Sequence, residues 1–381
     1  MLIGLCLDFY SGYDDGLLRG IGAYARPHKT WTFDHAFPTL AGVRGLLAQR
    51  PRGVIIRTAD AELLKLLRQA TVRVVNISNQ PKVPGVAQVS NDNRAIGAMA
   101  AEHLLRRGHT RFAYYALLPA RVDERLRGFQ EHLRLADRDC DVFLGGPDDV
   151  EPEALEAYER ELNLWLQKLV LPVAIFCDGD RFAWMITERC RRLGLRVPEQ
   201  VAILGVDNVA SMCALADPPL SSVQTASERI GYEAAQALEQ MLSDKVPNSL
   251  SIQVPPVRVA GRRSTDGVTV EDPWVHAALE HMRSHLIDTQ GIDWLSDKIG
   301  CSRRTLERRF RESLGYSPAD AWARFRLEEA ERLLADTELS LTAVAERCGF
   351  HVPKQMASVF RRMLGYGPRD FRKLAQPGYV G

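Results

Sequence analysis

The sequence predicts two α/β lobes, each built on a parallel sheet, followed by an all-α domain with two helix-turn-helix units. Three observations support this prediction. Short apolar runs alternate with amphipathic helical patterns up to about residue 263, no strand pattern follows that point, and the C-terminal part repeats itself at an offset of 49 to 50 residues. The length of 381 residues agrees with two or three domains, because one domain usually takes ~150 residues.

The first 263 residues alternate between strand and helix patterns. Strand patterns fall at residues 2–9, 53–57, 72–78, 111–117, 173–178 and 201–207. Amphipathic helix patterns fall between them, for example at residues 14–26, 94–108 and 181–194. Strands that alternate with helices indicate βαβ units, and this stretch is long for one sheet, so we expect two Rossmann-like lobes with helices on both faces.

The segment GVTVEDP, residues 267–273, breaks this pattern and is predicted to be a linker. It divides the chain into an α/β domain at residues 1–266 and an all-α domain at residues 274–381. The second domain is the basic one: from Leu295 onward the chain has 16 Lys and Arg against 11 Asp and Glu, although the whole chain has a formal net charge of only +1.

The composition, with 46% hydrophobic and 25% charged residues, is that of an ordinary globular protein and excludes disordered and fibrous classes. The seven cysteines form no CxxC pair, so we expect buried free thiols in a reducing compartment. The first residues lack the basic region of a signal peptide, and no apolar run approaches the ~20 residues of a membrane span. We therefore expect a cytoplasmic protein without a membrane contact.

The all-α domain uses one helical unit twice. Its apolar residues recur at an offset of 49, first as Ile292, Leu295 and Ile299 and then as Leu341, Val344 and Cys348. Further on, RRFRESLGYSP matches SVFRRMLGYGP at an offset of 50. Such a repeat indicates a duplicated supersecondary unit.

Local signals mark the helix ends in each unit. Gly300 and Gly349 end a first helix, because glycine tolerates the left-handed conformation of a sharp turn. A second helix follows and, in the first unit, stops at Gly315. Ser317 then caps a third helix, with Pro318 at its first position. Two helices joined by a short glycine turn are the outline of a helix-turn-helix.

The second helix of the first unit is rich in positive charge, with five arginines among residues 303–311. With Leu306 and Phe310 facing inward, Arg304, Glu307 and Arg308 fall on or near the exposed face. Two interpretations are open: a solvated surface helix, or a helix that enters the major groove of DNA. We favour DNA binding, because this is the second helix of a helix-turn-helix and a guanidinium group can grip guanine with two hydrogen bonds or hold a phosphate.

The stretch from residue 291 to residue 375 resembles the AraC-type DNA-binding domain, in which a long helix joins two helix-turn-helix units. The resemblance rests on the central helix SPADAWARFRLEEAERLLAD and on Gly349, Phe350, Phe360, Gly365 and Pro368 of the second unit. It implies double-stranded operator DNA as a partner. The expected DNA-binding residues are Ser302, Arg303, Arg304, Glu307, Arg308 and Lys354. Because Ser358 stands where the family usually has an arginine, we expect fewer base contacts from the second unit.

Charged residues follow several strand patterns of the α/β domain, at the sheet edge where such folds bind ligands. They are Asp92, Arg125, Asp178, Asp180 and Asp207. Carboxylates accept hydrogen bonds from hydroxyl groups and arginine donates two, so this mixture suits a sugar or another polyol. Aromatic candidates to cover a sugar ring are Tyr10, Tyr13, Phe182 and Trp184. The alternatives are helix capping for the aspartates and core packing for the aromatic residues, and two carboxylates without a third ligand are weak support for a metal.

From about Val86 to Arg262 the chain resembles the LacI/GalR-type effector domain, which is similar to periplasmic sugar-binding proteins. The motifs are VSNDNRAIGAMAAEHLLRRGHTRFAYY, RLRGFQEHL, AIFCDGDRFAWMI, GLRVPEQVAILGVDN and VPPVRVAGRRST. The resemblance implies a two-lobed periplasmic-binding-protein-like fold and sugar contacts from Asp92, Arg125, Asp180 and Asp207. Gly179 stands where the family usually has asparagine, and Asp178 is a candidate replacement.

A LacI-type effector domain followed by an AraC-type domain resembles a family of regulators that activate pentose catabolism in response to D-xylose. The resemblance implies a cytoplasmic homodimer with operator DNA and a sugar effector as partners, RNA polymerase as a candidate further partner, and no cofactor. Another sugar or polyol as effector, and repression instead of activation, remain open.

Two other classes of function fit the sequence less well. A periplasmic sugar-transport receptor would share the two lobes but would have an export signal and no helix-turn-helix repeat. An α/β enzyme such as a sugar kinase or hydrolase would need GxxxxGK[ST] or GxSxG, and the sequence has neither. The nine histidines show no metal-ligand or triad spacing, so we predict neither a metal site nor an enzyme.

Overall fold

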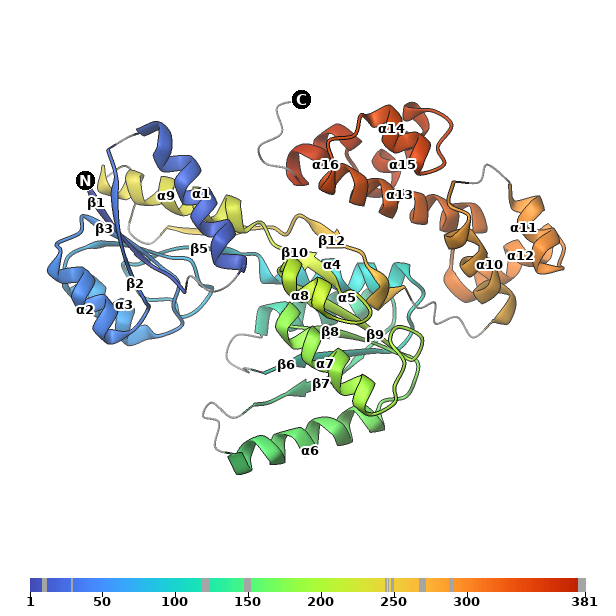
Figure 1. Cartoon of the computed structure of the whole chain (residues 1–381), viewed down its shortest axis with the longest axis horizontal. Coiled ribbons are helices and arrows are strands. Elements are labelled where there is room, and N and C mark those ends of the chain that lie inside the picture. Colours follow the sequence, from blue (N-terminus) through green and yellow to red (C-terminus); the bar gives the residue numbers. More distant parts are fainter. Residues whose placement is uncertain are drawn as a thin grey trace.

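The computed structural model contains two α/β lobes and a C-terminal helical domain, which confirms the predicted fold class (Figure 1). It describes residues 1–8, 12–28, 30–117, 123–146, 152–243, 245, 247, 250–266, 272–287 and 291–375. The helical domain packs against the second lobe rather than the first, through the long helix in its middle.

The first lobe has a six-stranded sheet in which all neighbouring strands are parallel. The strand order is β11 (Ser251–Val254), β5 (Ala87–Asn91), β4 (Arg73–Asn76), β3 (Gly53–Ile56), β1 (Leu2–Cys6) and β2 (Thr32–Ala36). Helices α1 (Gly12–His28) and α9 (Ser227–Leu242) cover one face, and α2 (Leu40–Ala48) and α3 (Ala61–Gln69) cover the other. Because side chains alternate along a strand, Ile3 and Leu5 join the core under α1 and α9, whereas Cys6 joins the opposite core.

The second lobe repeats this plan with one antiparallel edge. The strand order is β12 (Arg258–Ala260), β10 (Ser221–Gln224), β9 (Val201–Val206), β8 (Val173–Cys177), β6 (Phe112–Ala116) and β7 (Cys140–Leu144), and only the β10–β12 pair is antiparallel among these described strands. One face is covered by α4 (Asn93–Arg106) and α5 (Asp123–Leu135). The other is covered by α6 (Pro152–Lys168), α7 (Asp180–Arg192) and α8 (Ala210–Leu215). A short 3-10 helix, Arg263–Thr265, follows β12.

The chain passes between the lobes three times, after β5, after β10 and after β11. Each passage leaves the first or second sheet at the carboxyl end of a strand. The carboxyl ends of both parallel sheets therefore border the region between the lobes, and side chains that follow strands of either lobe are brought toward each other.

Glycines allow the helices of two pairs to pack with their backbones in direct contact. A Cβ atom at Gly97 of α4 would lie 2.1 Å from a backbone oxygen of α5, and a Cβ atom at Gly128 of α5 would lie 2.1 Å from a backbone oxygen of α4. Gly20 and Gly231 play the same part between α1 and α9 in the first lobe. Each lobe is thus built around one closely packed helix pair.

Replacement of Gly97 by alanine is expected to lower the free energy of unfolding by about 1–3 kcal/mol, because the new methyl group forces α4 and α5 apart. Gly22 in α1 is the matched control, since a Cβ atom added there would meet no other atom within 4 Å. Gly22→Ala should raise the free energy of unfolding by roughly 0.5–1 kcal/mol, as alanine is the better helix former. Urea denaturation measures both, and equal stability of the Gly97→Ala and wild-type chains would contradict the close packing.

The helical domain contains seven described helices arranged around two cores. They are α10 (Pro273–Ser284), α11 (Ile292–Ile299), α12 (Arg303–Leu314), α13 (Pro318–Asp336), α14 (Leu341–Arg347), α15 (Pro353–Leu364) and α16 (Pro368–Ala375). Helices α10 to α12 share one core with the first half of α13, and α14 to α16 share the other core with its second half. Since α13 belongs to both cores, it joins the two helix-turn-helix units rigidly.

The predicted helix ends of both units are confirmed. Gly300, Gly315, Gly349 and Gly365 all adopt left-handed backbone angles, with φ between 71° and 83°. Ser317 caps α13, because its hydroxyl accepts a hydrogen bond from the backbone of the third helical residue. These signals for helix ends depend only on residues within a few positions of each other, so they can be recognised in the sequence.

The helical domain starts with a helix that the sequence patterns above do not predict. Residues 267–271 of the predicted linker lie outside the described residues. Asp272 caps α10 by accepting a hydrogen bond from the Trp274 backbone N–H at 2.9 Å, and α10 begins at Pro273. Val275 and Leu279 of α10 then complete the first core.

Candidate ligand site and nucleic-acid interface

Arg125 is the centre of a buried polar cluster at the carboxyl ends of strands in the second lobe. Its Nη1 donates to Asp178 Oδ1 at 2.8 Å and to the Asp178 carbonyl oxygen at 2.5 Å. Its Nη2 donates to Asn93 Oδ1 at 2.8 Å. The Tyr114 hydroxyl also donates to Asp178 Oδ1, at 3.3 Å. Arg125 is only 8% exposed, so these charge-assisted bonds offset the cost of burying its charge.

Asp207 lies in the same electrostatic environment. It follows β9, where its backbone has the unusual φ of 96°, and its Oδ1 accepts a hydrogen bond from Thr225 Oγ1 at 3.3 Å. Burial raises the pKa of Asp207, and Arg125 nearby offsets part of this shift. Asp178, unlike Arg125, raises the pKa of Asp207 further. The cluster therefore holds two carboxylates around one guanidinium group.

The first lobe presents a second set of polar groups toward this cluster. Arg57 Nη2 forms an ion pair with the fully buried Asp14 at 2.7 Å, and the Arg57 guanidinium lies 5.6 Å from the centre of the Tyr13 ring. Asn91 Nδ2 donates to the Tyr13 hydroxyl at 3.1 Å. Burial raises the pKa of that hydroxyl, and Asp207 of the second lobe adds to the effect. Groups from the two lobes are thus within electrostatic reach of each other.

This arrangement suits a small polyhydroxylated ligand held between the lobes. Carboxylates and amide oxygens accept hydrogen bonds from ligand hydroxyl groups, guanidinium and amide N–H groups donate, and the Tyr13 ring offers an apolar surface. No group of three or more His, Cys, Asp or Glu side chains with metal-binding geometry occurs in the described part of the chain. The cluster offers hydrogen-bond donors and acceptors from Arg125, Asp178 and Asp207.

The four predicted sugar-binding residues occupy different positions in this structure. Arg125 and Asp207 are brought together in the cluster. Asp92 caps α4 through a hydrogen bond from the Ala95 backbone N–H at 2.9 Å, which is the capping role that its position after a strand also allows. Asp180 Oδ2 accepts from the Val209 backbone N–H at 2.7 Å, and burial raises the pKa of Asp180 to about 7. The carboxylates of Asp92 and Asp180 thus already stabilise the start of α4 and the loop before α8.

Three polar groups of the site were not predicted from the sequence. Asn91 and Asn93 flank Asp92 at the end of β5, and Arg57 follows β3. The rule that ligand groups follow strands would have found them if amides and arginines at every strand end had been considered with the carboxylates. Asp178, the candidate replacement for the missing asparagine, forms the buried ion pair with Arg125.

The aromatic candidates differ in their surroundings. Tyr13 lies among the first-lobe groups that face the cluster, whereas Tyr10 lies outside the described residues. Phe182 and Trp184 pack against the core of the second lobe, and Phe182 makes an edge contact with Tyr115. For these two residues the packing alternative holds.

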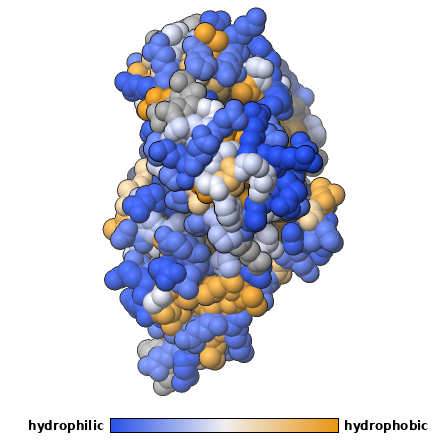
Figure 2. Space-filling view, turned by 90° about the vertical axis from the view of Figure 1, so that its right-hand side faces the viewer, coloured by the Kyte–Doolittle hydropathy of each residue, from blue (hydrophilic) through white to orange (hydrophobic). Residues whose placement is uncertain are grey.

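The exposed face of α12 has the geometry expected of a DNA-reading helix. Leu306 and Phe310 are fully buried, and Arg304 is exposed without a hydrogen-bond or ion-pair partner among the residues that the structure describes. Arg308 pairs with Glu312 at 2.8 Å and Arg303 with Glu307 at 2.9 Å, and all of these side chains are well exposed. Exposed pairs of this kind contribute little, so a phosphate or a base can replace the carboxylate. Seen from the side of α11 and α12, the surface is mostly hydrophilic (Figure 2).

Ser302, at the start of α12, and Arg309, in its middle, have structural roles. The Ser302 hydroxyl accepts a hydrogen bond from the Thr305 backbone N–H at 3.2 Å and caps α12. Arg309 Nη1 pairs with Asp272 at 2.5 Å, and its guanidinium lies over the Trp274 ring at 5.5 Å. The charge-rich run therefore divides into arginines that face solvent and one that attaches α12 to α10.

Helix α15 presents far less charge in the equivalent place. Lys354 is exposed at the position that corresponds to Arg304, and Ser358 is exposed at the position that corresponds to Arg308. Met356 and Phe360 are fully buried, like their counterparts in α12. The two helices thus share one buried scaffold and differ in the exposed groups, which supports a weaker base readout by the second unit.

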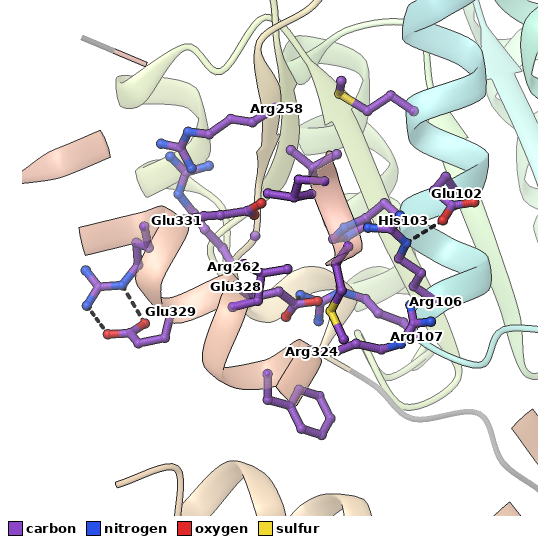
Figure 3. A pocket seen from close by; sticks show the side chains of 18 of the residues that line it. Glu102, His103, Arg106, Arg107, Arg258, Arg262, Arg324, Glu328, Glu329 and Glu331 are labelled. Carbon is purple, nitrogen blue, oxygen red and sulfur yellow. Dashed lines mark hydrogen bonds and ion pairs between the residues drawn. The ribbon is translucent and has the colours of Figure 1, made fainter. Parts of the chain in front are cut away.

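A cavity of about 430 Å³ lies between the second lobe and the helical domain (Figure 3). Ionisable side chains dominate its lining: Glu102, His103, Arg106, Arg107, Arg258, Arg262, Asp266, Arg283, Arg324, Glu328, Glu329, Glu331 and Arg332. Helix α13 contributes three glutamates and two arginines, and α4 and β12 contribute Glu102, Arg106 and Arg258 from the second lobe. This contact between domains is therefore polar and incompletely packed.

The protein is expected to lose stability as the pH rises from about 4.5 toward 8 because of Glu331 in this cavity. Burial raises the pKa of Glu331 from 4.5 to about 8, and the neighbouring Glu328 adds to the shift. Between these two pH values the folded state keeps a proton on Glu331 that the unfolded state has already released. This difference in proton binding stabilises the folded state, and the stabilisation is lost as the pH approaches 8. Glu331→Gln should reduce the fall in thermal midpoint between pH 6 and pH 9, whereas Glu329→Gln, which removes a pair with Arg332 on the same helix, should not. An equal fall in Glu331→Gln and the wild type would contradict the assignment.

Comparisons with known proteins agree with the two-part architecture. Residues 101–265 match the family described as periplasmic binding protein-like domain, and residues 295–374 match the family described as helix-turn-helix domain. Among the described residues, no helix combines the length and the apolar character needed to cross a bilayer.

The similarity to characterised proteins extends over nearly the whole chain. The xylose operon regulatory protein of Escherichia coli (strain K12) is 29% identical over 379 residues, which cover 97% of this chain and 96% of that protein. The protein of the same name from Haemophilus influenzae (strain ATCC 51907 / DSM 11121 / KW20 / Rd) is 25% identical over 385 residues and 97% of each chain. A solved structure of the xylose-binding transcription activator XylR is similar with a TM-score of 0.61 and 28% identity, covering 98% of both chains.

Proposed function

We propose that this chain, a sugar-responsive DNA-binding transcriptional regulator with a periplasmic binding protein-like domain before an AraC-type helix-turn-helix domain, responds to D-xylose. The cluster around Arg125, which faces polar groups of the first lobe, is the observation that supports a sugar ligand most directly. The similarity to xylose operon regulatory proteins over 97% of the chain supports D-xylose among the sugars.

In the proposed mechanism the sugar stabilises a closed arrangement of the two lobes. Arg125, Asp178 and Asp207 hydrogen-bond its hydroxyl groups from the second lobe, with Asp92 and Asp180 as the further predicted contacts. The groups around Tyr13 approach from the first lobe. The sugar shifts the balance between open and closed states only by as much as it prefers the closed one.

The proposed output is a change in how the two helix-turn-helix units meet operator DNA. Ser302, Arg303, Arg304, Glu307 and Arg308 of the first unit and Lys354 of the second are the proposed contacts. We propose activation of genes for pentose use by a cytoplasmic homodimer, with RNA polymerase as the partner in activation. The protein needs neither a cofactor nor a catalytic residue for this role.

Isothermal titration of the full-length chain with D-xylose, L-arabinose, D-ribose and D-glucose tests the proposal. We expect saturable binding of D-xylose, and weaker binding or none for the others. If another sugar binds and D-xylose does not, the effector is wrong and the class of function stands. If none of the four sugars binds, and a wider panel in a thermal-shift screen also gives no stabilisation, the sugar response itself is contradicted.

The DNA part of the proposal has its own measurement. A duplex enriched from a random-sequence library by the full-length chain should show a defined, reproducible motif. Enrichment that yields no common motif would contradict sequence-specific binding. Comparison of the affinity for the enriched duplex with and without D-xylose then shows whether the sugar acts on DNA binding.

A further inference from the structure

Helix α4 reaches from the proposed sugar site to the helical domain. Its first residue, Asn93, accepts the hydrogen bonds from Arg125, and its last turn leads into Arg107 at the cavity between the domains. Fourteen residues of α-helix span about 21 Å at ~1.5 Å per residue. One regular element therefore touches both functional regions.

This helix is packed tightly against α5. The close approach at Gly97 and Gly128 joins it to α5, the helix that also presents Arg125. An ion pair between Arg94 and Glu131 reinforces this contact on the surface. A displacement of Arg125 on ligand binding consequently moves α4 and α5 as one unit.

At the far end of α4, Arg107 links the lobe to the helical domain. Its Nη2 donates to Glu328 of α13 at 2.6 Å, and its Nη1 donates to Asp266 at 2.7 Å and to the Thr265 carbonyl oxygen at 3.2 Å. The Arg107 side chain is only 3% exposed. A buried charge favours the arrangement in which it keeps its partner, because loss of the partner leaves an uncompensated charge away from water.

Two further contacts join the same surfaces. The Tyr316 hydroxyl donates to the backbone oxygen of Arg106 at 3.0 Å. Arg258 of β12 pairs with Asp336 at the end of α13, at 3.2 Å, and the Arg258 side chain is 6% exposed. All the partners from the helical domain lie on α13 or directly before it, and α13 belongs to the cores of both helix-turn-helix units.

The interface is suited to a reversible change. A cavity of about 430 Å³ adjoins these contacts, so the two domains are not closely packed at this place. Such polar contacts between domains resemble those of transient complexes. A shift of α4 can therefore reposition α13 without breaking a hydrophobic core.

We propose that α4 couples sugar binding to DNA binding, with the Arg107–Glu328 pair as the principal link to the helical domain. This inference rests on the proposed function and names the residues through which the sugar site acts on α13. A movement of the Arg125 side chain changes the position of α4, and the buried pair passes this change to the helix that connects the two DNA-reading units.

Measurement of the coupling factor in the full-length chain tests this link. The factor is the ratio of the dissociation constants for the enriched duplex with and without saturating D-xylose, measured by fluorescence anisotropy. It should equal the ratio for D-xylose with and without duplex, because coupling is reciprocal. Factors of about 5–150 are typical, and Glu328→Gln should reduce the wild-type factor at least about threefold. Adding Asp336→Asn should reduce it further.

Glu328→Gln is the informative variant because Arg107 retains Asp266 and the lobe keeps its buried contact. Glu329→Gln is the matched control, since that glutamate pairs within α13 with Arg332 and should leave the factor unchanged. A Glu328→Gln chain that binds both ligands and keeps the wild-type factor overturns the proposed link. If the wild-type chain binds another sugar instead of D-xylose, the effector proposal fails, and the same titrations with that sugar test the coupling.

Discussion

Replacement of Arg125 by methionine is expected to weaken D-xylose binding by roughly 100-fold or more. Methionine retains most of the side-chain volume and removes every donor, so the proposed hydrogen bonds from the guanidinium group to the sugar are lost. Asp178 also loses its ion pair, and the positive charge near Asp207 disappears. The thermal midpoint should fall as well, because a buried carboxylate without its partner is costly. Isothermal titration and thermal unfolding measure the two effects separately.

The controls distinguish a lost contact from a lost fold. Arg94→Met on α4 removes an exposed pair with Glu131 of α5 and should leave D-xylose affinity unchanged. The double variant Arg125→Met with Asp178→Asn should recover part of the thermal midpoint without recovering affinity, because residue 178 then no longer has a buried charge without a partner. If the Arg125→Met chain binds D-xylose with wild-type affinity, Arg125 does not contact the sugar.

Replacement of Arg304 by alanine is expected to weaken binding to the enriched duplex by about 1–3 kcal/mol, or roughly 5- to 150-fold, and to relax specificity at one base position. Arg304 is exposed on α12 and has no hydrogen-bond or ion-pair partner among the described residues, so its guanidinium can form two hydrogen bonds to guanine. Lys354→Ala, at the equivalent place on α15, should weaken binding less and nearly equally for all sequences. Fluorescence anisotropy at several salt concentrations measures both variants.

The expected contrast between the two variants lies in the salt dependence. A lysine that contacts only phosphate accounts for about one unit of the slope of log K against log salt, and its loss should reduce the slope by that amount. Arg160→Ala, an exposed position on α6 of the second lobe, is the control and should change neither affinity nor slope. If Arg304→Ala has unchanged affinity and specificity, Arg304 is a solvated surface residue and does not contact DNA.

The helical repeat shows how far local signals reach. Glycines at helix ends, the Ser317 cap and the buried spacing of Leu306 and Phe310 all depend on residues within a few positions, and all are found in the structure as predicted. Helix α10 was not predicted, although its cap at Asp272 and Pro273 is an ordinary start signal. Helix α10 begins at the edge of the segment that was interpreted as a linker. The helix-breaking residues Gly267 and Pro273 of that segment obscured the start of the helical pattern.

The candidate sugar site shows where local signals stop. The rule that ligand groups follow strands selected Arg125 and Asp207, which lie together, but it could not rank Asp178 against Asp180. The first pairs with Arg125, whereas the second holds the loop before α8. This choice depends on how α5 and α7 pack, because either carboxylate satisfies the same sequence pattern.

The sequence by itself determined the two-lobed α/β architecture, the duplicated helix-turn-helix and the helix on which the arginines lie. Hydrophobic periodicity and helix caps are short-range properties, and a repeat is visible when the sequence is compared with itself. Only the tertiary structure decided which arginine of α12 is used internally, since Arg309 pairs with Asp272 from another helix. It also decided how the domains meet: Arg107 and Glu328 are 221 residues apart in the chain. Contacts at such separations arise from the packing of whole elements, and no local pattern records them.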